Sequence, residues 1–103
     1  MKLLRLLIAA IPVWPSIVGA SDDVAHELGS MLASEKFCEL TYNQEAIAAY
    51  IEQNVDEGDM GFASMLRLMT TGHSVGLKEL DESGKSAHCT QIRRVAKKYN
   101  FTE

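Results

Sequence analysis

The chain has 103 residues, 47% of them hydrophobic and 23% charged, and its formal net charge at pH 7 is −4. A chain of this length forms one domain, and its acidic balance disfavours nucleic acid, because nucleic-acid binding depends on neutralising phosphates. The composition therefore excludes a multidomain protein and argues against a nucleic-acid partner.

The first twenty residues, MKLLRLLIAAIPVWPSIVGA, have the pattern of a secretory signal peptide. Two basic residues precede an apolar stretch over residues 6–18, and Val18-Gly19-Ala20 is a small-residue cleavage site. An uncleaved membrane anchor is the alternative, but the stretch contains two prolines and is shorter than the roughly 20 residues that a bilayer span needs. We expect cleavage after Ala20, and a periplasmic or secreted chain whose residues 21–103 form a single helical domain.

A first helix is predicted from Ser21, a suitable capping residue, to about Ser34. The next stretch, SEKFCEL, lacks clear periodicity and is expected to form a turn or short helix that presents Phe37, Cys38 and Leu40 to the core. The apolar positions of the helix recur at helical spacing: Val24, Leu28, Met31 and Leu32.

A second helix is predicted after Asn43, which is a good capping residue. Tyr42 and Ile47 occupy the two positions of a hydrophobic staple. The acidic loop NVDEGD closes this helix, with Asn54 or Gly58 as the stop. The inner stripe is expected to consist of Ile47, Tyr50, Ile51 and Val55.

The segment from Asp59 to Leu80 is predicted to form a third helix with Asp59 as its cap. In a continuous helix Ser74 faces outward, and Gly72 and Gly76 face inward, where a neighbouring helix could approach closely. A break at Gly72, followed by a second short helix, is the alternative. The predicted inner arc contains Phe62, Met65, Leu66, Met69, Gly72, His73, Gly76, Leu77 and Leu80.

This segment contains Gly72-His73-Ser74-Val75-Gly76, which matches G-x-S-x-G, the nucleophile-elbow pattern of serine hydrolases. Asp81 and His88 follow Ser74 in the order of a catalytic triad. The elbow lies between a strand and a helix, however, and the preceding SMLRLMTT has helical spacing. On a continuous helix, residues seven apart are separated by about 10 Å of rise, whereas a triad needs about 3 Å. We interpret the motif as a chance match and predict no catalytic residue and no enzyme.

The last helix is predicted to begin at Asp81 or Ser83 and to close at Asn100 in the left-handed conformation, with Phe101 folded back. A basic amphipathic helix suits a membrane surface, but such a face is more often simply solvated, so we do not expect membrane binding. Its apolar arc holds Cys89, Ile92, Val95, Ala96 and Tyr99, and its other side holds Arg93, Arg94, Lys97 and Lys98.

The mature chain contains two cysteines, Cys38 and Cys89. In an exported protein an even number of thiols predicts a disulfide, and only one pairing is available. A redox or metal site is the alternative, but there is no C-x-x-C, and the three histidines, His26, His73 and His88, share no ligand spacing. We predict a structural Cys38–Cys89 disulfide, no metal site and no cofactor, with His73 as a core residue.

The stretches FCELTYNQEAI, DMGFASMLRLMTTG and AHCTQIRRVAKKYNF resemble small exported proteins of alphaproteobacteria to which no function is assigned. The resemblance covers most of residues 37–101. A looser similarity, in architecture only, is to periplasmic acid-stress chaperones, which are also small, helical and held by a single disulfide. The expected fold is an all-α bundle of about four helices stapled by one disulfide.

Charge is uneven along the chain: residues 21–59 carry ten acids and one base, whereas residues 60–103 carry seven bases and four acids. This uneven charge, together with the apolar faces of the helices, predicts a non-catalytic envelope protein that binds an unknown envelope protein or a second copy of itself. The alternative is an acid-stress periplasmic chaperone. At very low pH the 14 acids are neutral, the net charge of residues 21–103 moves from −6 to about +11, and self-repulsion opens the bundle.

Overall fold

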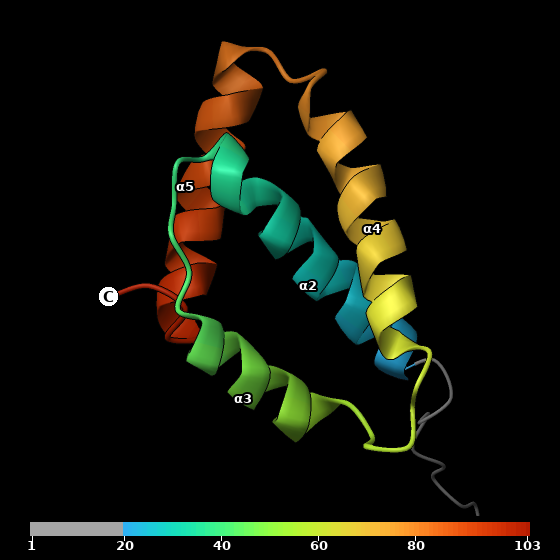
Figure 1. Ribbon diagram of the computed structural model, residues 1–103. Coiled ribbons are helices and arrows are strands. Elements are labelled where there is room, and N and C mark those ends of the chain that lie inside the picture. Colours follow the sequence, from blue (N-terminus) through green and yellow to red (C-terminus); the bar gives the residue numbers. More distant parts are fainter. Residues whose placement is uncertain (1–19) are drawn as a thin grey trace, which may run out of the picture.

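The computed structural model describes residues 20–103, which form four helices joined by short loops (Figure 1). Among these residues there is no strand. The predicted all-α bundle with one disulfide is therefore confirmed. The predicted signal peptide lies outside the described residues except for Ala20. The helices are α2 (Ala20–Phe37), α3 (Gln44–Asn54), α4 (Phe62–Leu77) and α5 (Glu82–Lys98).

Helices α2 and α4 make the main helix–helix contact and run in the same direction, because α3 and its two loops carry the chain back between them (Figure 1). Small buried residues one turn apart line α2 here: Ala25, Gly29 and Ala33. A Cβ built on Gly29 would lie 2.8 Å from Met69 Cβ and 3.1 Å from the backbone nitrogen of Thr70. Gly29 therefore marks a close approach that a side chain would prevent.

The inner face of α4 differs from the predicted arc. Gly72 and Gly76 are exposed. Apart from the nearby backbone of α4 itself, no atom lies within 4 Å of a Cβ built on either glycine, so no neighbouring helix packs against them. Leu80, also predicted to face inward, is 39% exposed. Ser74, predicted to face outward, is half-buried. The rest of the arc is confirmed as buried or half-buried: Phe62, Met65, Leu66, Met69, His73 and Leu77.

Two predicted helix starts and the predicted end of the first helix are wrong, whereas the continuous form of the third helix is confirmed over the break at Gly72 that was its alternative. Helix α4 is continuous through Gly72, and its N-cap is Gly61, without a side-chain hydrogen bond, rather than Asp59. Asp59 contributes only its backbone carbonyl, which accepts from Phe62 N at 3.3 Å. Helix α2 includes Ser21 and extends to Phe37, three residues beyond the predicted end.

Helix α4 ends at Leu77, three residues before the predicted Leu80. The predicted ends of the other two helices are confirmed. Asn43 caps α3, its side-chain oxygen accepting from the backbone nitrogens of the second and third helical residues at 2.9 and 3.2 Å. Helix α3 ends at Asn54. Asp81 caps α5 by accepting from Gly84 N at 2.7 Å. Asn100 has the predicted left-handed backbone, with φ of 64°, and Phe101 folds back to be fully buried.

An aromatic cluster joins the C-terminal end of the chain to α3. Its ring centroids lie 5.0–5.9 Å apart, and Asn43 N donates a hydrogen bond to Phe101 O at 2.7 Å. The Tyr42 hydroxyl donates to Met31 O at 2.8 Å, which ties the same cluster to α2. Burial, assisted by the Glu35 carboxylate, raises the pKa of Tyr42 to about 12. The cluster consists of Tyr42, Tyr50, Tyr99 and Phe101.

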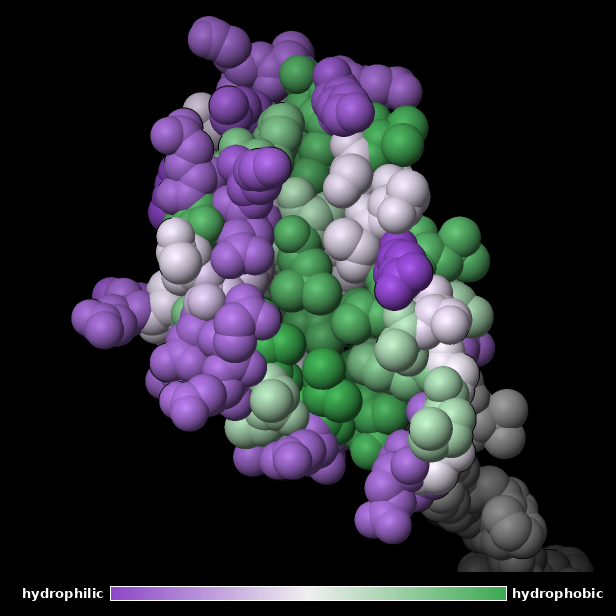
Figure 2. Space-filling model, viewed as in Figure 1, coloured by the Kyte–Doolittle hydropathy of each residue, from purple (hydrophilic) through white to green (hydrophobic). Residues whose placement is uncertain are grey.

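The core is open on one face of the molecule. Figure 2 shows apolar side chains in a continuous band between α3 and α5 on one side and α4 on the other, with hydrophilic residues mainly along the α3 and α5 side and at the ends. Several apolar residues that pack against the core are accordingly only partly buried. Among them are Ile51 and Val55 of the α3 side and Met65, Leu66 and Met69 of α4.

Candidate functional site

The structure does not bring the residues of the apparent triad into one network. Ser74 lies inside α4, half-buried in a shallow hollow against the end of α2. The Asp81 carboxylate is engaged by Gly84 N, and His88 Nε2 lies 2.7 Å from Ser34 Oγ. A nucleophile elbow requires a serine on the turn between a strand and a helix, and Ser74 occupies no such turn.

Ser74→Ala is expected to leave any measured activity unchanged and to change the free energy of unfolding by less than about 0.5 kcal/mol, because Ser74 is a half-buried helical residue. Labelling with a fluorophosphonate probe, followed by mass spectrometry, measures the reactivity of the hydroxyl directly. Heat-denatured protein serves as the control for non-specific labelling. Stoichiometric modification of Ser74 in the folded protein would contradict the interpretation.

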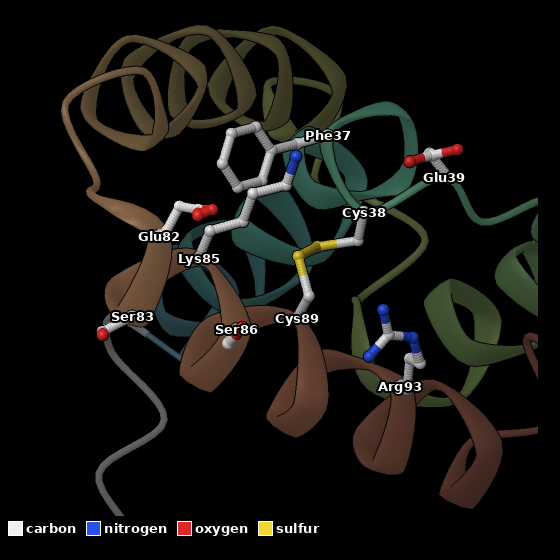
Figure 3. A pocket seen from close by; sticks show the side chains of 9 residues that line it. All are labelled: Phe37, Cys38, Glu39, Glu82, Ser83, Lys85, Ser86, Cys89 and Arg93. Atoms are coloured by element: carbon white, nitrogen blue, oxygen red, sulfur yellow. A yellow bond between two sulfur atoms is a disulfide. The ribbon is translucent and has the colours of Figure 1, made fainter.

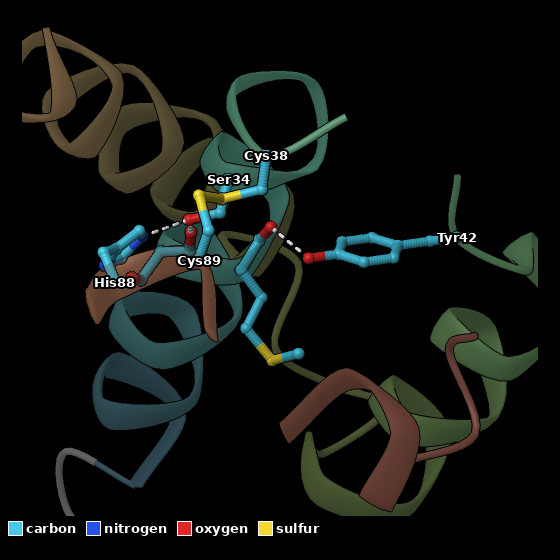
Figure 4. Close-up of a disulfide and its surroundings, with 7 residues drawn as sticks. Ser34, Cys38, Tyr42, His88 and Cys89 are labelled. Carbon is cyan, nitrogen blue, oxygen red and sulfur yellow. Dashed lines mark hydrogen bonds between the residues drawn. A yellow bond between two sulfur atoms is a disulfide. The ribbon is translucent and has the colours of Figure 1, made fainter. Parts of the chain in front are cut away.

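His88 is paired instead with Ser34, beside the disulfide (Figure 4). Ser34 has no exposed surface, and its hydroxyl donates to Ser30 O at 2.7 Å, so its oxygen accepts from His88 Nε2. This hydrogen-bond pattern assigns the proton of a neutral His88 to Nε2. Because no substrate reaches a fully buried hydroxyl, the pair serves as a polar link between α2 and α5.

Sequence reasoning missed the Ser34–His88 pair, although it could have been inferred from the predicted disulfide. Ser34 lies one helical turn before Cys38, and His88 immediately precedes Cys89. Bridging the two cysteines therefore brings the serine and the histidine to the same junction between helices.

The predicted disulfide between Cys38 and Cys89 is present, with 5.5 Å between the two Cα atoms. The cysteines are only 5% and 2% exposed, so a thiolate in solution has little access to the sulfur atoms. A hollow of about 480 Å³ lies beside the bridge, with Lys85 Nζ 5.0 Å from the centroid of the Phe37 ring (Figure 3). Charges of both signs line this hollow and favour no ligand charge: Glu39, Glu82, Lys85 and Arg93.

Two histidines meet where α2 and α4 pack together. The ring centroids of His26 and His73 are 4.6 Å apart, although the sequence gave no reason to connect them. His73 Nε2 is buried and has no hydrogen-bond partner. Burial, and secondly the charge of His26, lower the pKa of His73 below its ordinary value of 6.5. Asp23 and Glu27 of α2 line the same hollow. The neutral form of His73 therefore suits the folded chain better than the charged form.

We expect the protein to lose stability through His73 as the solution is acidified. Because the pKa of His73 is lowered by folding, the unfolded chain binds this proton more readily. The stabilising contribution is therefore fully present above the ordinary histidine pKa and is lost as the pH falls through the lowered folded-state pKa. Thermal unfolding at about pH 7.5 and about pH 5.0 should show a smaller decrease of Tm for His73→Gln than for the wild type. Equal decreases would contradict this assignment.

A groove of about 970 Å³ lies between the end of α3 and the start of α4. Its floor is apolar and consists of Ile51, Val55 and Phe62, of which the first two are only half-buried. Met60 stands at its border with 86% of its surface exposed. We call this feature the acidic groove, because four carboxylates also line it: Glu52, Asp56, Glu57 and Asp59.

The loop of residues 55–61 places three of these carboxylates beside the apolar floor, and Glu52 comes from the last turn of α3. Asp56 Oδ2 accepts from Gly58 N at 3.0 Å, and Asp56 O accepts from Asp59 N at 3.0 Å. A further turn follows, in which Met60 N donates to Gly58 O at 3.0 Å. These consecutive turns reverse the chain over a short distance, so the acidic loop stays next to both helices.

The electrostatic character of the acidic groove follows from a long stretch without bases. No lysine, arginine or histidine occurs between Lys36 and Arg67, whereas six carboxylates do. Carboxylates that face one hollow add their fields, so the groove attracts positive charge. Sequence reasoning treated the apolar stripe and the acidic loop as separate features and missed the groove. Their adjacency in the chain, together with the absence of bases, was the available signal.

In the part of the chain that the structure describes, no group of three or more histidines, cysteines and carboxylates is placed to hold a metal ion. None of the four described helices is long and apolar enough to cross a membrane. Comparisons with protein-family models, with curated proteins and with solved structures find no match. The acidic groove, with its partly exposed apolar floor and four carboxylates, is the candidate functional site.

Proposed function

We propose that residues 21–103 form a non-catalytic helical module of the periplasm or the extracellular space, which binds another protein through the acidic groove. The observation that carries this proposal is the apolar floor of the groove, where Ile51 and Val55 remain only half-buried beside the buried Phe62. Partly exposed apolar surface with a polar border is typical of protein-interaction sites. The Cys38–Cys89 disulfide supports export, because such bonds persist in oxidising compartments.

Site-specific photo-crosslinking tests the proposed interaction. Met60 is replaced by the photoreactive residue p-benzoylphenylalanine, since its exposure at the border of the groove allows the change without disturbing the core. The matched control carries the same residue at Gln91, an exposed position of α5. After irradiation of intact cells, we expect a discrete protein adduct from position 60 and none from position 91. Adducts from both positions, or from neither, would contradict a groove-specific partner.

The same preparation tests export and processing. Mass spectrometry of protein recovered from the envelope or the medium should give a chain that begins at Ser21, because Val18-Gly19-Ala20 supplies the cleavage site. Recovery of the chain with residues 1–20 attached would contradict cleavage after Ala20.

A second function, that of an acid-activated chaperone, is favoured by one observation. The His26–His73 contact lies where α2 packs on α4, and protonation of both rings would place two like charges within 4.6 Å at that contact. Acidification then weakens the packing while the disulfide limits how far the chain opens. The expected result is that the protein suppresses aggregation of a test substrate at about pH 2–3 and not at about pH 7. No suppression at either pH would contradict this function.

A further inference from the structure

We propose that the acidic groove binds a basic amphipathic helix of another protein, with apolar side chains on the floor and lysine or arginine side chains at the border. This inference rests on the proposed interaction function and specifies the chemistry of the partner. Three features of the described residues lead to it: the composition of the groove, its position between two helices, and the surfaces that a second copy of the chain would offer.

The composition of the groove requires an occupant that is both apolar and basic. Ile51 and Val55 are half-buried beside the buried Phe62, so an apolar anchor that covers them removes further apolar surface from water. Met60 has a flexible, polarizable side chain that adapts to anchors of different shapes. All the charged residues that line the groove are carboxylates, so positive charges beside the anchors are favoured and negative charges are repelled.

The position of the groove favours a helical occupant. The groove lies between the end of α3 and the start of α4, and no sheet edge exists among residues 20–103 to pair with an extended strand. An extended peptide would leave its backbone groups without partners on the apolar floor, whereas a helix satisfies them internally. Helix α3 has 11 residues and is about 16 Å long, which matches an occupant of about three turns.

A second copy of this chain does not offer the required surface. The basic face of α5 is backed by Cys89, Ile92 and Ala96, which are already buried in the core, so it carries charge without free apolar anchors. The outer face of α4 carries the exposed side chains of Leu68 and Val75, but Arg67 is the only charged residue of that helix. Neither surface combines apolar anchors with several positive charges, so the occupant is a different protein.

Peptide binding tests this inference on the mature chain. The first probe is a fluorescent helical peptide of about 14 residues with leucines at positions i, i+4 and i+7 and lysines on the flanking positions. The second has glutamate in place of every lysine, and the third has the composition of the first with the leucines dispersed around the helix. Anisotropy at about 25 mM salt should give a Kd for the basic amphipathic peptide at least about tenfold lower than for either control. Salt at about 500 mM should weaken its binding.

Variants assign the binding to the groove. Glu52→Gln combined with Glu57→Gln removes two exposed border carboxylates and is expected to raise the Kd of the basic peptide about fivefold. Glu39→Gln combined with Glu45→Gln removes two exposed carboxylates outside the acidic groove and should leave the Kd unchanged. Met60→Ser, at an exposed position that folding does not require, should weaken binding through the lost apolar contact. Equal effects of the two glutamine pairs would overturn the assignment.

The outcomes separate this inference from the proposed function. If the basic and acidic peptides bind equally and Met60→Ser weakens both, the groove binds proteins but the partner is not basic, and only the inference falls. If no peptide binds and position 60 gives no crosslinked adduct in cells, both fall. If light scattering shows a dimer that Met60→Ser dissociates, a second copy occupies the groove and the inference is overturned.

Discussion

Replacement of Cys38 or Cys89 by serine is expected to lower the Tm by about 10 °C or more. The two cysteines are 51 residues apart, and the loop that they close contains the whole of α3 and α4. In the chain-entropy model, closure of such a loop stabilises the folded state by about 4 kcal/mol. A small domain has a total stability of about 5–10 kcal/mol, so the bridge contributes a large fraction of it.

Differential scanning calorimetry of the two single variants and the double variant measures this effect, and all three should melt at about the same temperature because each breaks the same bond. Ser86→Ala, an exposed substitution in the hollow beside the disulfide, is the matched control and should melt like the wild type. Two free thiols in protein isolated from its native compartment would contradict a structural bridge, and so would a wild-type Tm for the serine variants.

Gly29→Ala is expected to lower the free energy of unfolding by about 2 kcal/mol, although alanine has the higher helix propensity. The added methyl would lie 2.8 Å from Met69 Cβ and 3.1 Å from the backbone nitrogen of Thr70. Neither atom is the end of a flexible side chain, so α2 and α4 must move apart to make room. That movement loosens the main helix–helix contact, which the buried Ala25 and Ala33 extend on either side.

The chain contains its own controls for this substitution. Gly72→Ala and Gly76→Ala place the same methyl group in a helix where nothing lies within 4 Å. Each is therefore expected to raise the free energy of unfolding by about 0.5–1 kcal/mol through helix propensity alone. Urea denaturation of the three variants measures the difference in sign. A stabilising Gly29→Ala, or destabilising effects at Gly72 and Gly76, would contradict the observed register of α4.

Features that depend on neighbouring residues could be predicted from the sequence. Asn43 and Asp81 cap their helices because a short polar side chain reaches the free backbone nitrogens of the first turn, whatever the rest of the fold does. Asn100 likewise adopts the left-handed backbone that lets Phe101 turn back. The disulfide could be predicted because only one pairing was available.

The register of α4 could not be predicted, because the helix has apolar residues on both sides. Met65 and Met69 face the core, whereas Leu68 and Val75 are exposed, so polarity does not distinguish the two faces. The close approach predicted at Gly72 and Gly76 is absent, and the helices α2 and α4 approach each other closely at Gly29 of α2 instead. Which glycine receives a neighbour depends on which helices pack together, and local periodicity carries no information on that.

The acidic groove lay beyond prediction for a similar reason. The sequence identified Ile51 and Val55 as inward-facing residues and the acidic segment after them as a loop. How completely other elements cover an inward-facing stripe depends on the tertiary arrangement, and here Ile51 and Val55 remain half-buried in the groove. The Ser34–His88 pair, by contrast, could have been predicted. It follows from the predicted disulfide once the α2 helix is extended to Phe37.

In the sequence, the exposed loop of residues 55–61 lies between the two cysteines of the disulfide, Cys38 and Cys89. Exposed loop tips are preferred sites of proteolytic nicking. A single cut in this loop would convert the protein into two polypeptides that remain covalently joined, with α2 of one still packed on α4 of the other. A protease that cuts this loop once would thus release no fragment, and release would require a second cut or a reductant.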